Sequence, residues 1–332
     1  PDPGFGIAAF DQLAGASHMT LVSQLAHKPW IWAWLGAVSM WLIITGVSGI
    51  GAGGQVMSAA ASFGTFFVIV AVGQMFVITL GPGNVDLSIP ACMTLSATLA
   101  MKFMDGDPGL LIPGFLISLG VGMVIGTTNF LLILFLRIPP IIATLSASFL
   151  YQSTAIWSNR GLRVKPPEIL GDFAVSKIAG VPILTLVALL MTVGMAFLLH
   201  RTRFGLSVLA VGQNQKAAKL AGIKVERVRF LTYLMCAVLA AVCGFFLAGF
   251  SGGAALNMGE QYLLMSIAVV VIGGTSVAGG YANLTGLWGA SLFMFLLVSM
   301  LNTLGLSAGF RLIVTGAIIV AVIVVSGRKL AR

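Results

Sequence analysis

Few side chains in this 332-residue chain could do chemistry, and their types point to binding rather than to catalysis. No lysine is followed by serine or threonine, so the chain lacks the phosphate-binding GxxxxGK[S/T] loop of nucleotide hydrolases. The three histidines, His18, His27 and His200, form no metal-ligand or acid–base motif. We therefore predict no catalytic residue, no metal and no cofactor in this chain.

Asp86 is the one acidic residue within the long apolar runs and the short breaks between them. An ionisable group at membrane depth marks a functional site by default, because burying its charge in lipid is costly. The alternative is that Asp86 and Ser88 accept hydrogen bonds from the free N–H groups at the start of the next helix. We favour this capping role, with Arg137 as the ion-pair partner to look for.

Neutral polar side chains within the apolar runs could line a path for a polar, uncharged substrate. They offer hydrogen bonds without fixed charge, although each is more often an interhelical hydrogen bond worth less than about 1 kcal/mol. The predicted substrate-pathway residues are the neutral Gln74, Asn84, Asn129, Tyr151, Gln152, Thr275 and Asn302, together with the acidic Asp86.

The composition requires membrane-spanning helices to position these side chains. Hydrophobic residues make up 58% of the chain and charged residues 8%, whereas soluble domains carry about 25% charged residues. We predict an all-α, polytopic transmembrane helical bundle that forms a single domain over residues 20–332. About ten runs reach the roughly 20 apolar residues that a spanning helix needs: 30–50, 56–80, 87–104, 110–136, 138–157, 181–200, 230–250, 262–279, 284–304 and 309–327.

Two further segments depart from this pattern. Gly81-Pro82-Gly83-Asn84 cannot continue a helix, because glycine favours other dihedral angles and proline lacks an N–H donor, so we predict a broken helix near residues 81–86. Residues 1–19 end in Ser17-His18-Met19, which looks like a cloning junction, and we exclude them from the fold.

The distribution of basic residues sets the orientation. Ten spans place both termini on one side, and with that side inside, twelve of the 18 Lys and Arg residues are internal. Because cytoplasmic loops carry the excess of basic residues, we predict that both termini are cytoplasmic. This topology explains the net charge of +9 without nucleic acid. The main external loop is then 158–180 and the main cytoplasmic loop 201–229.

The cytoplasmic loop is predicted to contain a short helix. Asn214 can cap its start, and Gly222 lies where a helix C-cap belongs. Ala217 and Ala218 are small enough to let this helix sit deep in a cleft of another protein, and Gly212 would permit a sharp entry.

This loop resembles that of the permease subunits of bacterial ribose-type ABC importers, in the branched-chain amino acid/ribose permease superfamily. The runs 83–89 (Gly-Asn-Val-Asp-Leu-Ser-Ile) and 268–280 are also similar to segments of that family. The resemblance covers about residues 31–327.

The resemblance implies a permease subunit of the bacterial inner membrane that moves a monosaccharide or similar polyol and is not itself an enzyme. Its implied partners are an ATP-binding subunit that holds ATP and Mg, a periplasmic or lipid-anchored sugar-binding protein, and a second permease subunit, identical or paralogous. The ATPase-coupling residues are then Gly212, Asn214, Ala217, Ala218, Ala221 and Gly222.

Three alternatives remain open. A branched-chain amino acid ABC permease would have a similar internal loop. A stand-alone carrier coupled to protons or sodium would normally place several ionisable residues in its spans, and here only Asp86 qualifies. The loop could also be an ordinary basic cytoplasmic loop that docks nothing.

Overall fold

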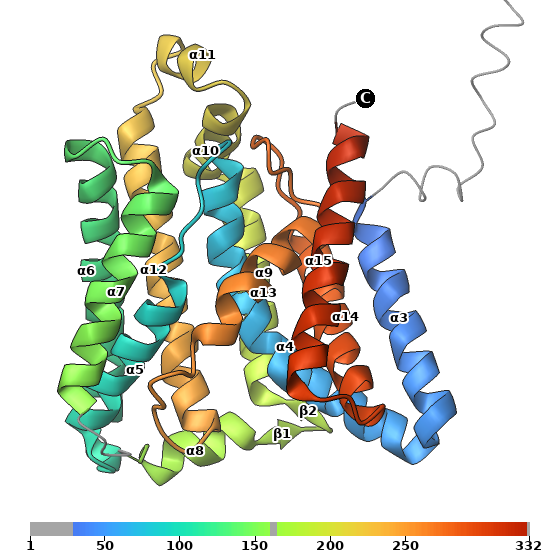
Figure 1. The fold of residues 1–332 in the computed structure, drawn as a ribbon. Helices are drawn as coiled ribbons and strands as arrows, with labels where there is room; N and C mark the ends of the chain where they lie inside the picture. Colours follow the sequence, from blue (N-terminus) through green and yellow to red (C-terminus); the bar gives the residue numbers. More distant parts are fainter. Residues whose placement is uncertain (1–28, 160–164, 331–332) are drawn as a thin grey trace, which may run out of the picture.

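The computed structural model describes residues 29–159 and 165–330 as a bundle of long helices (Figure 1). The predicted tail, residues 1–19, lies outside the described residues. The long helices are α3 (Pro29–Ser48), α4 (Ile50–Thr79), α5 (Ile89–Met104), α6 (Leu111–Phe135), α7 (Pro140–Asn159), α9 (Ile183–Arg201), α12 (Val225–Phe250), α13 (Glu260–Ile272), α14 (Leu284–Thr303) and α15 (Ala308–Leu330). The shorter elements are η1 (Pro108–Leu110), α8 (Glu168–Val175), α10 (Arg203–Gln213), α11 (Gln215–Leu220), β1 (Lys177–Ile178) and β2 (Val181–Pro182).

The predicted all-α, polytopic character is confirmed, and a long helix stands at each of the ten predicted runs. By length and composition, six of the described helices could cross a membrane: Trp30–Ser48, Ile50–Thr79, Pro108–Phe135, Ile183–Arg201, Val225–Phe250 and Leu284–Thr303. The full count of ten spans stays a prediction.

One local prediction was wrong. The predicted run 262–279 is helical only to Ile272, because Gly274 adopts a φ of 87° and starts a loop that runs to Asn283. The segment predicted as the main external loop contains α8 and leads into a two-stranded antiparallel hairpin in which Ile178 faces Val181. Both turn residues of this hairpin have positive φ, as a tight two-residue hairpin requires.

The predicted broken helix is confirmed. Helix α4 ends at Thr79, and Gly81 and Gly83 adopt φ angles of 114° and 79°. The chain then turns back, so that α5 begins partway along the bundle rather than at its end (Figure 1).

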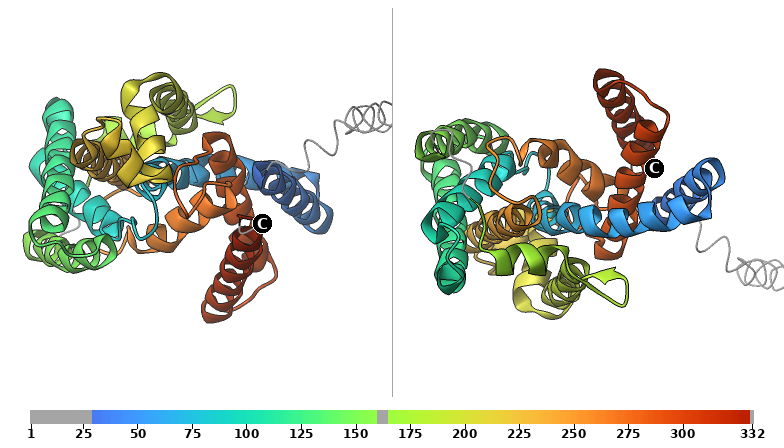
Figure 2. Two further views of the ribbon diagram at one scale, coloured as in Figure 1. Left: turned by 90° about the horizontal axis from the view of Figure 1, so that it is seen from above. Right: turned by 90° about the horizontal axis from the view of Figure 1, so that it is seen from below.

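Helix α4 lies at the centre of the bundle. Its second half, from Gly64 to Thr79, is buried throughout, and it packs against α12, α13 and α14. Seen from below, it crosses the middle of the molecule, with α6 and α7 at one edge and α3 and α15 toward the other (Figure 2).

Close packing of α6 on α12 explains the GxxxG pair of α6. A Cβ atom at Gly122 would lie 2.9 Å from the Ala237 carbonyl oxygen, and one at Gly126 would lie 2.7 Å from the Leu234 Cα atom. Glycines at these positions therefore let the two backbones approach, as is typical of helices packed in membranes.

The two ends of the bundle carry different elements. Helices α10 and α11 and the C-terminal end of α15 lie at one end, whereas α8 and the β1–β2 hairpin lie at the other (Figure 1). We call these the α11 end and the α8 end.

Candidate functional site

The short helix predicted in the internal loop is confirmed as α11, with both predicted caps. The Asn214 side-chain oxygen accepts a hydrogen bond from the Ala217 N–H at 3.0 Å. At the other end, Gly222 adopts a φ of 84°, and its N–H donates to the Lys219 carbonyl at 3.1 Å. The Ile223 N–H donates to the Ala218 carbonyl at 3.0 Å, which completes a Schellman C-cap. The ends of α11 are thus fixed by the sequence itself.

The two alanines of α11 lie in different environments. Ala217 is exposed, but Ala218 is only 5% exposed and belongs to the main hydrophobic core of the chain. Ala218 therefore already packs within its own chain, and the expectation that it enters a partner together with Ala217 does not fit this structure.

The sequence analysis missed Leu220, whose side chain is 90% exposed at the last turn of α11. Leu220 lies three residues after Ala217 and one before Ala221, so these exposed apolar side chains share one face of the helix. We call this the α11 docking face: Ala217, Leu220 and Ala221. The clue in the sequence was a leucine between basic and small residues.

Gly212, near the end of α10, is needed for close approach rather than for a sharp turn. Its φ is not positive, but a Cβ atom there would overlap the Thr79 carbonyl oxygen and the Gly280 nitrogen. The Gly280 N–H donates to the Thr79 carbonyl at 2.9 Å, and the Gln213 side chain donates to the Gly280 carbonyl at 3.5 Å. Three backbone segments therefore meet at this point.

Gly279 completes this contact. It has a φ of 89°, and a Cβ atom there would overlap the Gly81 Cα and come within 2.9 Å of the Gly212 carbonyl oxygen. We call this contact the glycine junction: Gly81, Gly212, Gly279 and Gly280. It joins the break after α4, the loop after α13 and the end of α10, from which α11 follows directly.

Several predicted pathway residues come together just after the break, around the start of α5. Asp86, Ser88 and Asn129 are all fully buried. The Ser88 N–H and hydroxyl donate to one Asp86 carboxylate oxygen at 2.9 and 2.6 Å, and the Asn129 amide donates to the Ser88 hydroxyl at 2.7 Å. The Tyr151 hydroxyl donates to the Asn129 side-chain oxygen at 3.0 Å. The chain of hydrogen bonds runs from the break to α6 and α7.

Gln74 joins the same cluster from α4. Its side-chain oxygen accepts a hydrogen bond from the Asp86 N–H at 3.3 Å. Its amide nitrogen and the second Asp86 carboxylate oxygen have no hydrogen-bond partner among the described residues. We call Gln74, Asp86, Ser88, Asn129 and Tyr151 the break cluster. Because its members mostly satisfy one another, it holds the break in place in this conformation.

The capping expectation for Asp86 holds only in part. Asp86 accepts the N–H of Ser88, the residue before α5, but Ser88 makes no side-chain capping bond. Arg137 does not pair with Asp86, since the single salt bridge among the described residues joins Arg229 to Glu226 at 3.2 Å.

The remaining predicted pathway residues lie elsewhere. The Asn84 amide donates to the Gly81 carbonyl at 3.1 Å, and its oxygen accepts from the Tyr233 hydroxyl at 3.2 Å, so Asn84 supports the break itself. Gln152 donates to the Leu256 carbonyl at 2.7 Å.

Thr275 and Asn302 are also outside the break cluster. The Thr275 hydroxyl accepts from the Asn283 N–H at 3.2 Å within the loop after α13. Asn302 is exposed near the end of α14. Neither residue joins the substrate-pathway residues around Asp86.

The sequence analysis named Ser88 only as a cap of the next helix, and it did not name Thr144, whose hydroxyl accepts from the Leu87 N–H at 3.0 Å. The Asp-x-Ser spacing also suits the local bond from the Ser88 N–H to the Asp86 side chain. Thr144 comes from another helix, so its role depends on the tertiary fold.

Among the described residues, no group of three or more His, Cys, Asp or Glu side chains could hold a metal ion. The three cysteines, Cys92, Cys236 and Cys243, are free and buried. The arrangement offers hydrogen bonds and close backbone contacts.

Comparison with known proteins finds relatives among transport permeases. The ribose import permease protein of Bacillus subtilis (strain 168) is 33% identical over 271 residues, which cover 79% of this chain and 82% of the relative. The ribose import permease protein of Escherichia coli (strain K12) is 28% identical over 266 residues, with the same coverage. The fructose import permease protein of Bifidobacterium longum is 29% identical over 248 residues, 73% of this chain and 69% of the relative. No solved structure matches the chain.

The family model described as "branched-chain amino acid transport system / permease component" matches residues 31–323, nearly the whole described chain. The chain therefore belongs to this family of transport permeases.

Proposed function

We propose that the chain is the transmembrane permease subunit of an ABC importer that moves a monosaccharide or similar polyol across a bacterial inner membrane. ATP hydrolysis would take place in a separate subunit that docks on the α11 docking face. The observation that carries this coupling is the 90% exposure of Leu220 on a doubly capped helix that follows directly from the glycine junction.

The proposed topology has ten spans, with both termini and α11 in the cytoplasm. The six long apolar helices and the helices at the other predicted runs support this count. The arrangement of α10, α11 and the end of α15 at one end of the bundle is consistent with it (Figure 1). The α8 end then faces outward, where a periplasmic or lipid-anchored sugar-binding protein would deliver the substrate.

The proposed mechanism follows from the packing of the glycine junction. A movement of α11 by the ATPase would shift the end of α10, which cannot slide past backbone in direct contact without moving it. The segment after α4 and the loop after α13 would therefore move together. A second permease subunit, identical or paralogous, would complete the path. The path would switch between two states of access, and the sugar-binding protein and the ATPase would each favour one of these states in turn.

Two observations favour a sugar over a branched-chain amino acid. The relatives named above are called ribose and fructose import permeases. In addition, the break cluster presents amide, hydroxyl and phenol groups around one carboxyl group and holds no described cation that could pair with a substrate carboxylate. A zwitterionic amino acid would be expected to need both charges in its path.

One observation favours a carrier driven by protons or sodium instead, namely the buried Asp86 oxygen that lacks a hydrogen-bond partner. The two mechanisms differ in their energy source. Uptake by the reconstituted permease alone under an ion gradient would support the carrier, whereas a requirement for the ATPase and ATP would support the importer.

The coupling is tested by substituting Leu220 in the complete complex, reconstituted in proteoliposomes with its ATPase and sugar-binding protein. Burial of a leucine side chain contributes about 1.5–3 kcal/mol, so Leu220→Asp should weaken ATPase binding at least about tenfold and abolish ATP-dependent uptake. Leu220→Met keeps the apolar volume and should retain both activities.

Because Leu220 makes little contact with its own chain, Leu220→Asp should still insert and elute as folded protein on size exclusion. Full ATP-dependent uptake by this variant would contradict docking at α11.

A further inference from the structure

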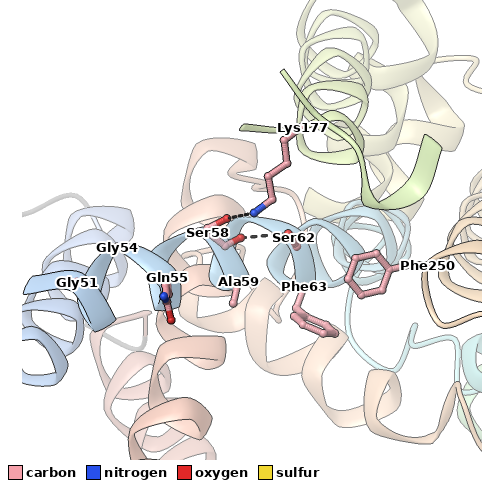
Figure 3. Close-up of a pocket in the computed structure, with 9 residues that line it drawn as sticks. All are labelled: Gly51, Gly54, Gln55, Ser58, Ala59, Ser62, Phe63, Lys177 and Phe250. Atoms are coloured by element: carbon pink, nitrogen blue, oxygen red, sulfur yellow. Dashed lines mark hydrogen bonds between the residues drawn. The ribbon is translucent and has the colours of Figure 1, made fainter. Parts of the chain in front are cut away.

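An open groove of about 510 Å³ lies beside the first half of α4, toward the α8 end of the bundle (Figure 3). Its lining comes from α4, from Lys177 of β1 and from Phe250 at the end of α12. In the proposed topology this end faces outward. The groove is thus far from the α11 docking face and is distinct from the break cluster.

The upper side of the groove carries a small polar array. The Lys177 ammonium group donates to the Ser58 hydroxyl at 2.8 Å, and the Ser62 hydroxyl donates to the Ser58 carbonyl at 3.1 Å (Figure 3). Lys177 forms no salt bridge with any described residue, so it has further N–H donors to offer. Gln55 is exposed in the groove, and its amide makes no hydrogen bond within the described part of the chain.

The inner end of the groove is aromatic. The Phe63 and Phe250 rings meet edge to face with centroids 5.1 Å apart (Figure 3). Each ring is held from behind, Phe63 by a stack on Phe295 at 5.4 Å and Phe250 by an edge contact with Phe66 at 5.5 Å. The aromatic wall is therefore fixed, while Phe63 remains 37% exposed.

The rest of the lining is glycine and alanine, which leave the space open. The volume falls in the range of about 300–1,000 Å³ that is typical of small-molecule sites. Such sites combine apolar or aromatic walls with a few placed polar groups. Ring C–H groups of a sugar can pack on the phenyl rings, while its hydroxyl groups reach Gln55, Ser58 and Lys177.

We propose that this groove is an entry site for a neutral, polyhydroxylated molecule of monosaccharide size, occupied before the molecule reaches the break. This site rests on the proposed function and specifies where the substrate first binds the permease. A neutral ligand fits better than an anion, since the groove has one cation, already engaged by a serine, among amide and hydroxyl groups.

Thiol labelling tests the site, because the three native cysteines are buried and give little background. Ala59→Cys places a thiol in the groove without removing a polar group. Glu168→Cys, on exposed α8 outside the groove, is the matched control. Both variants are labelled with a membrane-impermeant maleimide in the complete complex. The probes are D-ribose, D-fructose, D-xylose, D-glucose and D-galactose, with inorganic phosphate as the anionic probe.

A sugar that the complex imports should slow labelling of Ala59→Cys at least fivefold and leave Glu168→Cys unchanged. Adding Gln55→Ala should raise the sugar concentration for half-protection about three- to tenfold, the effect expected when a hydrogen bond is lost. Import of a sugar that does not slow labelling of Ala59→Cys would overturn the entry site but leave the proposed function intact. Failure to import any sugar of the panel with ATP would count against the proposed function itself. Protection of Ala59→Cys by phosphate but by no sugar would also overturn the entry site. So would a failure of the maleimide to reach this thiol because the second permease subunit covers it.

Discussion

The Gly280 N–H donates to the carbonyl oxygen of Thr79 across 2.9 Å, linking the loop after α13 to the last residue of α4. The two residues are far apart in the chain. Helices α4 and α13 each end just before a glycine-rich stretch, and these stretches meet here. The Gly212 backbone fills the remaining space between them. The end of α10 thus contacts both segments at once, and α11 is joined to that end.

The substitution Gly212→Ala tests the glycine junction. Its Cβ would overlap two backbone atoms, so we expect the junction to open and the free energy of unfolding to fall by about 1–3 kcal/mol, with loss of ATP-dependent uptake. Thermal melting and proteoliposome uptake measure the two effects.

Gly194→Ala in α9 is the matched control, because a Cβ atom there would meet nothing within 4 Å. It should leave uptake intact and raise stability by up to about 1 kcal/mol, since alanine favours the helix. Normal uptake by Gly212→Ala would show that the junction is not needed for coupling.

Tryptophan substitutions distinguish the two faces of α11. Ala218→Trp places a large side chain in the core and should destabilise the protein by about 1–3 kcal/mol through overpacking. Ala217→Trp projects outward and should leave the melting temperature nearly unchanged while reducing co-purification of the ATPase. If Ala217→Trp keeps full ATPase binding, the α11 docking face is assigned wrongly.

Asp86→Asn and Asp86→Ala test whether Asp86 orders the break or carries a coupling ion. Asparagine keeps an oxygen that can accept from Ser88, so a purely structural role predicts uptake close to that of the unmodified chain. Alanine leaves the Ser88 donors unpaired in a buried site, at a cost of about 1–3 kcal/mol. Complete loss of uptake in Asp86→Asn with an unchanged melting temperature would favour ion coupling.

Tyr151→Phe asks whether the break cluster is a scaffold or a substrate contact. It removes the hydroxyl that donates to Asn129 at 3.0 Å. We expect a loss of stability of about 0.6 kcal/mol, the average for such bonds between membrane helices, and little change in KM for uptake. A severalfold rise in KM at unchanged stability would instead place Tyr151 on the substrate path.

Features that depend on local chemistry follow from the sequence alone. Apolar runs of sufficient length become helices wherever they occur, and the Gly-Pro-Gly-Asn stretch ends α4 because of its own dihedral and donor properties. The caps of α11 were equally predictable, since the side chain of Asn214 and the positive φ of Gly222 act within a few residues.

Which side chains meet depends on how the helices pack. Asn129 and Tyr151 reach the break because α6 and α7 pack beside α5, whereas Asn302, equally polar, stays exposed at the end of α14. The same packing turned Ala218 inward and left Leu220 outside. In lipid, composition fixes that helices form, because every backbone group must be paired within a helix or barrel. Which helices become neighbours depends on how side chains far apart in the sequence fit together. The role of Gly212, which lets the Thr79 and Gly280 backbones come close to α10, therefore could not be read from its neighbours in the sequence.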